Sequence, residues 1–235
     1  MAEPPRAWIG ASRFCNNPRR KGSTLNTEQQ HRLPAWRWVG DRGLLVATGE
    51  ATLACYAMLT SLAFDEVEDV VPAEGSLLLV LRPGVSLSAR LREALAAPVP
   101  EVPAASGKLH EIPVAYGGEA GPDLAEMARR AGLSMDAYIA HHAAGEYTVA
   151  FLGFQPGFPY LRGLPSALHA PRRSRPRVRV DAGSVAVGGS YTGIYPASGP
   201  GGWNIVGRSP VALFDPQREA PALLLPGDRV RFVPT

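Results

Sequence analysis

The sequence predicts an α+β protein with two parts, a small α/β sandwich of the ferredoxin-like type and a compact β-barrel. Three observations predict this fold class. Residues 36–97 alternate between short apolar runs with strand periodicity and longer runs with helix periodicity. A cluster of prolines then interrupts both periods. From Thr148 onward, short apolar runs are separated by glycine and proline, which is typical of barrel strands joined by tight turns.

The elements of the first part follow from hydrophobic periodicity and turn residues. The expected order is strand, helix, strand, strand, helix, at residues 43–48, 51–64, 67–72, 76–81 and 87–97. Ser86 or Ser88 is expected to begin the last helix, because a serine hydroxyl accepts a hydrogen bond from the first helical turn. This order of elements indicates a ferredoxin-like sandwich over residues 36–97.

The boundary between the two parts is expected at residues 98–107. This segment contains three prolines, and proline suits neither a helix interior nor a central strand. The barrel part then covers residues 108–235. Before its main run of strands we expect a strand at 110–114 and helices at 123–131 and 135–143.

Residues 1–35 differ from the rest of the chain in composition and charge. The formal net charge of the whole chain is +3, and this segment carries +4, so the remaining residues total −1. The basic balance is therefore a property of the N-terminus and a weak argument for nucleic-acid binding. We expect the segment to be disordered or to be an extension from an over-called start codon.

Composition and cysteine content favour a globular cytoplasmic protein. Hydrophobic residues make up 46% of the 235 residues, enough to bury one or two cores. No apolar run approaches the roughly 18 residues of a membrane helix, and no apolar signal-peptide region follows the basic N-terminus. Cys15 and Cys55 have neither metal spacing nor a disulfide framework, which suits a reducing compartment; Cys55 is expected in a core.

Several motifs rich in glycine, proline and aromatic residues lie in the second part, and their order is specific. They read GFQPGFPYLRGLP at 153–165, PRR at 171–173, AGSV at 182–185, TGIYP at 192–196, PGGW at 200–203, LFDP at 213–216 and LLLPGDRVRFVP at 223–234. Together they resemble the family of the 5-oxoprolinase B subunit, also called the KipI or allophanate hydrolase subunit 1 family. The likeness extends with weaker motifs back to about Trp36.

The resemblance implies a cyclophilin-like barrel and a role as one subunit of an enzyme. The implied activity is ATP-dependent opening of 5-oxoproline to glutamate, with C-type and A-type subunits as partner proteins. A lactam is stabilised by amide resonance, so phosphorylation of its oxygen by ATP would activate it, and arginines would stabilise the developing charge. The chain has no phosphate-binding G-x-x-x-x-G-K-[ST] loop, so ATP is expected to be held by the assembled complex.

Two other functions implied by the family name stay open. One is a related subunit for amide hydrolysis or carboxyl transfer, as the allophanate hydrolase label suggests. The other is a KipI-like inhibitor that binds a sensor histidine kinase. From the charge distribution and the lack of long apolar runs, we expect neither a nucleic acid nor a membrane as a partner.

Other site chemistries receive little support from spacing. Residues 123–143 could form a helix-turn-helix around Gly132, but its second helix has no arginine or lysine for DNA phosphates. His141, His142 and Glu146 are close in sequence, but adjacent histidines point about 100° apart on a helix, so no metal site is predicted. No serine satisfies the G-x-S-x-G pattern, and the catalytic residues stay unassigned.

The expected anion-binding element is the arginine run that begins in the PRR motif and ends before AGSV, with Arg172, Arg173, Arg175, Arg177 and Arg179. Arg172 and Arg177 match family positions and are the preferred contacts, with Arg208 as a third. Arg175 and Arg179 could equally belong to a charged edge strand that faces solvent.

The aromatic residues among the motifs could line a pocket or pack the barrel. His142 lies where the family carries a histidine, and it could instead be hydrogen-bonded inside the fold. The complete set of predicted substrate- or partner-binding residues is His142, Phe154, Gly157, Phe158, Tyr160, Arg172, Arg177, Tyr191, Thr192, Tyr195, Trp203 and Arg208.

The chain departs from the family's usual motifs at positions near this expected site. The affected residues are Arg175, Asp181, Ser190, Tyr191 and Gly199. Tyr191, with Ser190, lies where the family reads GGQTGIYP, and a tyrosine ring with one hydroxyl replaces an amide that both donates and accepts. Such a change can alter which small polar group the site accepts.

Overall fold

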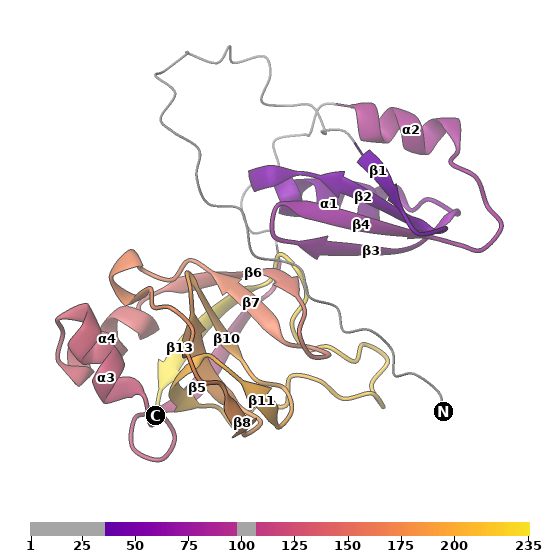
Figure 1. Ribbon diagram of the computed structural model, residues 1–235. Helices are drawn as coiled ribbons and strands as arrows, with labels where there is room; N and C mark the ends of the chain where they lie inside the picture. The colour runs from indigo at the N-terminus through magenta and orange to yellow at the C-terminus, as the bar shows by residue number, and fades with distance from the viewer. Residues whose placement is uncertain (1–35, 98–106) are drawn as a thin grey trace, which may run out of the picture. The chain divides into compact units, whose positions relative to one another are not determined.

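The computed structural model describes residues 36–97 and 107–235 (Figure 1). The expected N-terminal extension, residues 1–35, lies outside the described residues. The expected linker, residues 98–107, also lies outside them except for Gly107.

The first part is a four-stranded antiparallel sheet with two helices, as Figure 1 shows. Its strands are β1 (Trp36–Val39), β2 (Gly43–Ala47), β3 (Val67–Ala73) and β4 (Ser76–Leu81). Its helices are α1 (Thr52–Leu62), preceded by a 3-10 turn at Gly49–Ala51, and α2 (Ala89–Ala96). The expected order of strands and helices is confirmed from β2 to α2, and β1 is an additional strand.

The strand order β1-β2-β4-β3 explains the ferredoxin-like character of this part. In a ferredoxin-like sheet the strand that follows the second helix lies beside the first strand. Here β1, which precedes β2 in the chain, pairs with β2 and occupies that edge position. The ferredoxin-like arrangement and the arrangement in this chain therefore both produce a four-stranded antiparallel sheet.

Local sequence signals account for the helix and strand boundaries in this part. The hydroxyl of Ser88 accepts a hydrogen bond from the amide of Leu91 at 3.0 Å, so α2 begins at Ala89 and not at residue 87. In β4, Leu77, Leu79 and Leu81 are buried in alternation, as period-2 packing on one face requires. Cys55 is a buried free cysteine of the same core, as expected.

The second part is a closed seven-stranded barrel, which confirms the predicted barrel fold. The strand order is β10-β7-β6-β13-β5-β12-β9, and pairing of β9 with β10 closes it. Strands β5 and β13 are parallel, and the other neighbours are antiparallel. The strands are β5 (Leu109–Tyr116), β6 (Glu146–Leu152), β7 (Pro159–Arg162), β9 (Ser184–Gly188), β10 (Tyr191–Ile194), β12 (Asn204–Arg208) and β13 (Arg229–Pro234).

Two helices cover part of the barrel, α3 (Leu124–Ala131) and α4 (Met135–Ala143). Gly132, with φ of 67°, ends α3 in the left-handed conformation that glycine adopts readily. The side chains of Tyr138 and His142 on α4 are buried, so this helix packs into the barrel core. None of the helices in the described ranges is long and apolar enough to cross a membrane.

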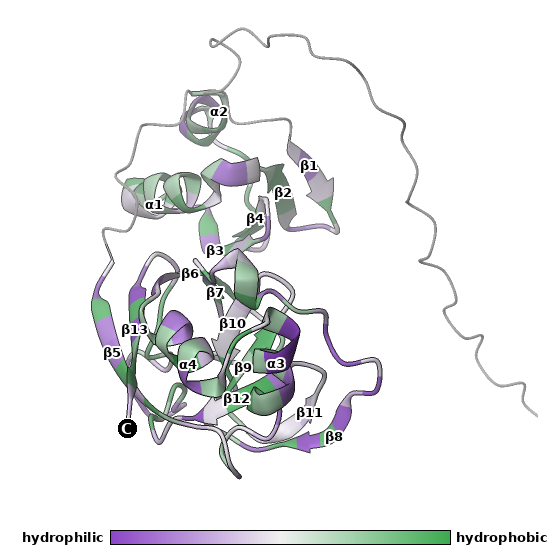
Figure 2. Ribbon diagram, turned by 90° about the vertical axis from the view of Figure 1, so that its left-hand side faces the viewer, coloured by the Kyte–Doolittle hydropathy of each residue, from purple (hydrophilic) through white to green (hydrophobic). Residues whose placement is uncertain are grey.

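The barrel wall separates two apolar cores. On β9, Val185 and Val187 belong to the barrel interior, whereas Ala186 belongs to a second cluster outside the wall. This outer cluster consists mainly of aromatic side chains. A short ladder of β8 (Arg177–Val180) and β11 (Gly199–Gly201) forms a separate sheet, and Figure 2 shows the hydrophilic residues of β8. A 3-10 turn, Ser166–Leu168, precedes β8.

Candidate functional site

A cavity of about 280 Å³ opens in the outer aromatic cluster. Five aromatic rings form much of its wall, and two arginines and three small or cyclic residues complete it. The lining residues are Phe154, Phe158, Tyr160, Arg172, Arg173, Pro176, Tyr195, Gly201, Gly202 and Trp203. Six of the predicted site residues therefore meet in one cavity.

The aromatic rings hold one another in edge-to-face contact. Phe158 lies against Tyr195, Tyr160 and Trp203 at centroid distances of 5.1, 5.3 and 5.3 Å. Such contacts place the positive edge of one ring on the negative face of another and restrict both rings. Phe158 and Tyr195 are 1% exposed and Trp203 is 7% exposed, so these residues pack the outer core and line the cavity together.

Glycine allows the Trp203 indole to lie on the barrel wall. A Cβ at Gly188 would lie 2.6 Å from Trp203 Cδ2, closer than packed atoms approach. The wall residue at the end of β9 must therefore lack a side chain.

The loop before β8 supplies the charged side of the cavity. Arg172 is exposed, and no acidic side chain within residues 36–97 and 107–235 forms an ion pair with it. Burial raises the pKa of the Tyr160 phenol, and the positive charge of Arg172 partly offsets this rise. An arginine placed in this way beside aromatic walls suits a small carboxylate.

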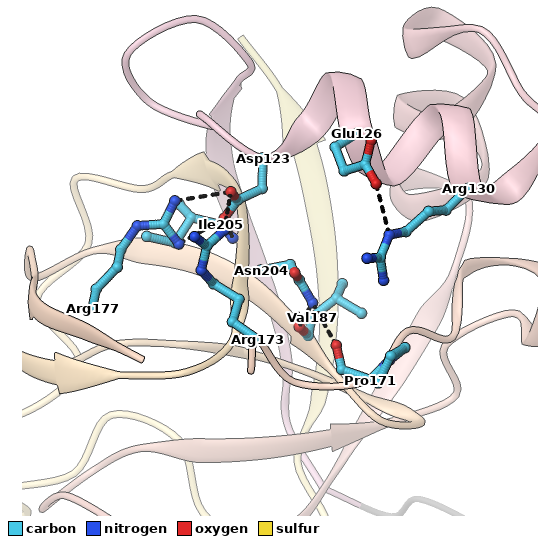
Figure 3. A network of polar contacts seen from close by, with 9 residues as sticks. All are labelled: Asp123, Glu126, Arg130, Pro171, Arg173, Arg177, Val187, Asn204 and Ile205. Atoms are coloured by element: carbon cyan, nitrogen blue, oxygen red, sulfur yellow. Dashed lines mark hydrogen bonds and ion pairs between the residues drawn. The ribbon is translucent and has the colours of Figure 1, made fainter. Parts of the chain in front are cut away.

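Arg173 and Arg177 are bound to Asp123, at the N-terminal end of α3 (Figure 3). Arg177 donates to both carboxylate oxygens at 2.8 and 2.9 Å, and Arg173 donates to Oδ1 at 2.9 Å. Arg177, a predicted anion contact, therefore already has an internal partner and does not line the aromatic cavity. Arg173 both pairs with Asp123 and lines the cavity.

A strained turn presents Phe154 at the rim. Phe154 is 59% exposed and has φ of 66°, a left-handed conformation unusual for a residue of this size. The turn is closed by a hydrogen bond from the amide of Gly153 to the carbonyl of Phe158 at 3.1 Å. Gly157, with φ of 76°, has no room for a side chain because a Cβ would lie 2.8 Å from Phe214. Gly157 therefore shapes the turn and does not itself line the cavity.

His142 and Thr192 lie inside the barrel and not at the aromatic cavity. His142 has no exposed surface, and its Nδ1 and Nε2 lie 2.7 Å from the Tyr116 hydroxyl and 3.0 Å from the Thr192 hydroxyl. Burial lowers the pKa of His142 to about 3, so the ring is neutral at physiological pH. Of the two alternatives for His142, this geometry favours a hydrogen-bonded core residue.

Tyr191 lies on the outer side of the barrel wall, next to the cavity residues. It is 9% exposed and contacts Tyr160 and Phe151 edge to face at 5.7 and 5.8 Å. Burial raises the pKa of its phenol. The residue that departs from the family motif thus packs against Tyr160, which lines the cavity.

Arg208 lies in a second, more polar hollow. Its Nη2 is 2.9 Å from Asp181 Oδ2, and Asp181 also accepts a hydrogen bond from Arg179 at 3.1 Å. The hollow contains Arg177, Arg179 and Arg208 but also Asp181 and Glu119, so its charges largely balance. Arg208 is therefore separate from the aromatic cavity.

Four further lining residues were not in the predicted set of site residues: Arg173, which belongs to the arginine run, Pro176, Gly201 and Gly202. All four belong to the motif-rich region, and Gly201 and Gly202 precede Trp203 directly. Asp123 was also missed, because only the folded chain brings it to the arginine run.

The fold belongs to a recognisable class of protein. Residues 34–224 match the family model described as the carboxyltransferase domain, subdomain C and D. A relative from Escherichia coli O157:H7, named as the B subunit of 5-oxoprolinase, is 48% identical over 170 residues, which cover 72% of this chain and 78% of that protein. The chain belongs to the family of the 5-oxoprolinase B subunit.

Further comparisons agree with this family and fold. The Bacillus subtilis (strain 168) protein of the same name is 52% identical over 126 residues, and the match spans only 52% of its length. The crystal structure of TTHA0988 superimposes with a TM-score of 0.72 at 43% identity, over 83% of this chain and 40% of that chain. Kluyveromyces lactis urea carboxylase has the same fold at 18% identity, with a TM-score of 0.61, over 85% of this chain and 21% of that chain.

Proposed function

We propose that this chain is the B-type subunit of an ATP-dependent 5-oxoprolinase and that its aromatic cavity binds 5-oxoproline. The observation that carries the proposal is that Arg172, which has no acidic partner among the described residues, lines a cavity walled by aromatic rings. The name shared by the relatives supports the reaction.

The size of the cavity supports a small ligand. Its volume of about 280 Å³ lies just below the range of roughly 300–1,000 Å³ for small-molecule sites, which suits a ligand of a single ring. The substrate 5-oxoproline is a single five-membered lactam ring with one carboxylate. The ring would pack against Phe158 and Trp203, and the carboxylate would accept two hydrogen bonds from Arg172.

Tyr160 is the proposed donor to the lactam. Its ring contacts the rings of Phe158 and Tyr191, and burial raises the pKa of its phenol, so the hydroxyl keeps its proton at physiological pH. A protonated hydroxyl can donate to the lactam oxygen and stabilise negative charge there. The chain would thus bind and polarise the substrate.

A complete ATP molecule does not fit in the aromatic cavity. The cavity is small for a nucleoside triphosphate, and its charged side has only Arg172 and Arg173, one of which is bound to Asp123. We therefore propose that ATP is held by the assembled complex and derive no step through it. The proposed partners are the C-type and A-type subunits, in the cytoplasm.

The direct test is reconstitution. The chain is co-expressed with A-type and C-type subunits, and ATP-dependent release of glutamate from 5-oxoproline is measured with and without it. Release that requires this chain supports the proposal, and equal release without it contradicts the proposal. A stable complex that releases no glutamate would indicate a different amide or carboxyl-transfer substrate.

A pair of variants tests the site within that assay. Arg172→Ala should raise KM for 5-oxoproline about tenfold to hundredfold, since hydrogen bonds to charged groups contribute roughly 1.5–3 kcal/mol. Arg175→Ala is the matched control, because Arg175 is an exposed arginine of the same loop that does not line the cavity. Equal KM values for both variants would show that Arg172 does not contact the substrate.

A further inference from the structure

Asp123 is a fully bonded carboxylate beside the candidate site. Its two oxygens accept four hydrogen bonds, one from Arg173, two from Arg177 and one from the amide of Ile205 at 2.7 Å. A carboxylate has about four lone-pair positions, so Asp123 is saturated. The Asp123 side chain is 10% exposed, so its carboxylate is largely buried, and the arginine partners are partly exposed.

The position of Asp123 in the chain makes these partners unexpected. Asp123 is the N-cap residue of α3, where an aspartate usually accepts a hydrogen bond from the first helical turn. Its side chain makes no such bond. It is directed at the loop arginines instead, so the helix forgoes a stabilising cap in favour of contacts with the cavity loop.

The loop between residues 171 and 177 is held on both sides of Arg172. Asn204 Nδ2 donates to the carbonyl of Pro171 at 3.0 Å, as Figure 3 shows. On the other side, the amide of Arg173 donates to the carbonyl of Gly202 at 2.7 Å, and its guanidinium is bound to Asp123. The backbone of Arg172 therefore lies between two anchored residues.

We propose that Asp123 is a positioning residue for the substrate site: its bonds to Arg173 and Arg177 hold the loop so that Arg172 stays at the aromatic cavity. This role rests on the proposed function of that cavity. Asp123 does not line the cavity and acts through the arginines. It also neutralises Arg173 and Arg177 in part, which leaves Arg172 as the cavity arginine available to an anionic substrate.

The experiment measures steady-state kinetics of the reconstituted complex with 5-oxoproline as the varied substrate. Asp123→Asn keeps the side-chain shape, but it removes the negative charge and presents an amide N–H₂ to arginines that are themselves donors. We expect KM to rise about tenfold, within the range of coupling between contacting residues, while kcat changes less than about threefold.

A double-mutant cycle separates positioning from general destabilisation. If Asp123 acts through Arg172, Asp123→Asn should raise KM little further in an Arg172→Ala background. A purely structural role would lower the melting temperature and give the same relative change in KM in both backgrounds. That additive result would overturn the inference.

Two further variants keep the test decisive if Asp123→Asn folds poorly. Arg177→Lys retains the charge but loses the bidentate contact, so it should raise KM by a smaller factor. Asp181→Asn is the matched control, since Asp181 also pairs two arginines, Arg179 and Arg208, away from the aromatic cavity. Its KM should equal that of the wild type.

The outcomes also separate this inference from the proposed function. If Arg172→Ala raises KM but Asp123→Asn and Arg177→Lys leave it unchanged, the positioning role is wrong and the site stands. If Arg172→Ala itself leaves KM unchanged, the proposed substrate site is wrong, and the positioning role of Asp123, which depends on that site, is wrong with it.

Discussion

His142 Nε2 donates a hydrogen bond to the hydroxyl of Thr192 across 3.0 Å in the interior of the barrel. The direction follows from the Thr192 hydroxyl, whose own hydrogen is donated to the carbonyl of Ala186 at 3.0 Å. His142 Nδ1 must then accept a hydrogen bond from Tyr116. The three side chains form a single directed chain of hydrogen bonds that ends on strand β9.

The first prediction concerns the pH dependence of stability. The pKa of His142 is about 3 in the folded chain, against an ordinary value of 6.5. Between these two pH values the unfolded chain binds more protons than the folded chain. The contribution of neutral His142 to the free energy of unfolding is therefore fully present above about pH 6.5 and is lost as the pH falls toward 3. His142→Gln should remove a slope of about 1.4 kcal/mol per pH unit from the free energy of unfolding.

Urea denaturation at pH 5.5 and pH 4.5, both between the two pKa values, measures this slope. His141→Gln is the control, because His141 lies on the same helix and is exposed. A wild-type slope in the His142→Gln protein would show that this histidine is not buried in its neutral form.

The second prediction tests the acceptor in the same chain. Thr192→Val removes the hydroxyl and leaves His142 Nε2–H buried without a partner, which should cost about 1–3 kcal/mol of unfolding free energy. Thr192→Ser keeps the hydroxyl and should cost less than the valine variant. Equal stability of the two variants in thermal or urea denaturation would contradict the hydrogen-bond assignment.

The third prediction concerns the wall behind Trp203. Gly188→Ala places a methyl group 2.6 Å from the Trp203 ring, and displacement of the ring should cost about 1–3 kcal/mol and raise KM. Gly153→Ala is the control, since its Cβ would meet Tyr160 at an ordinary 3.6 Å. Stability is measured by urea denaturation and KM in the reconstituted complex. Unchanged values for Gly188→Ala would mean that Trp203 is not held against β9.

The fourth prediction separates strain from binding at Phe154. Phe154→Gly and Phe154→Ala both remove the ring from the rim and should raise KM to a similar extent. Only glycine adopts a φ of 66° without steric cost, so the glycine variant should be the more stable of the two by about 1 kcal/mol. Urea denaturation compares them. An alanine variant of equal stability would show that the turn is not strained.

Predictions from sequence succeeded where the physical cause is local. The alternation of Leu77, Leu79 and Leu81 and the Ser88 cap each act within a few residues, so they fix strand and helix positions directly. Strand β1 was missed because its pattern, WRWV, leaves all four residues exposed, and its place depends on pairing with β2.

The sequence by itself determined the family, the fold class and the region that contains the cavity, because ordered glycine, proline and aromatic motifs specify turns and packed rings. The tertiary structure alone decided which charged side chains are paired with an internal partner and which are not. Arg177 and Asp123 are 54 residues apart, and His142 and Thr192 are 50 apart. Only folding brings such pairs together, so spacing could not reveal that Arg177 is paired and His142 is buried, whereas Arg172 has no acidic partner among the described residues.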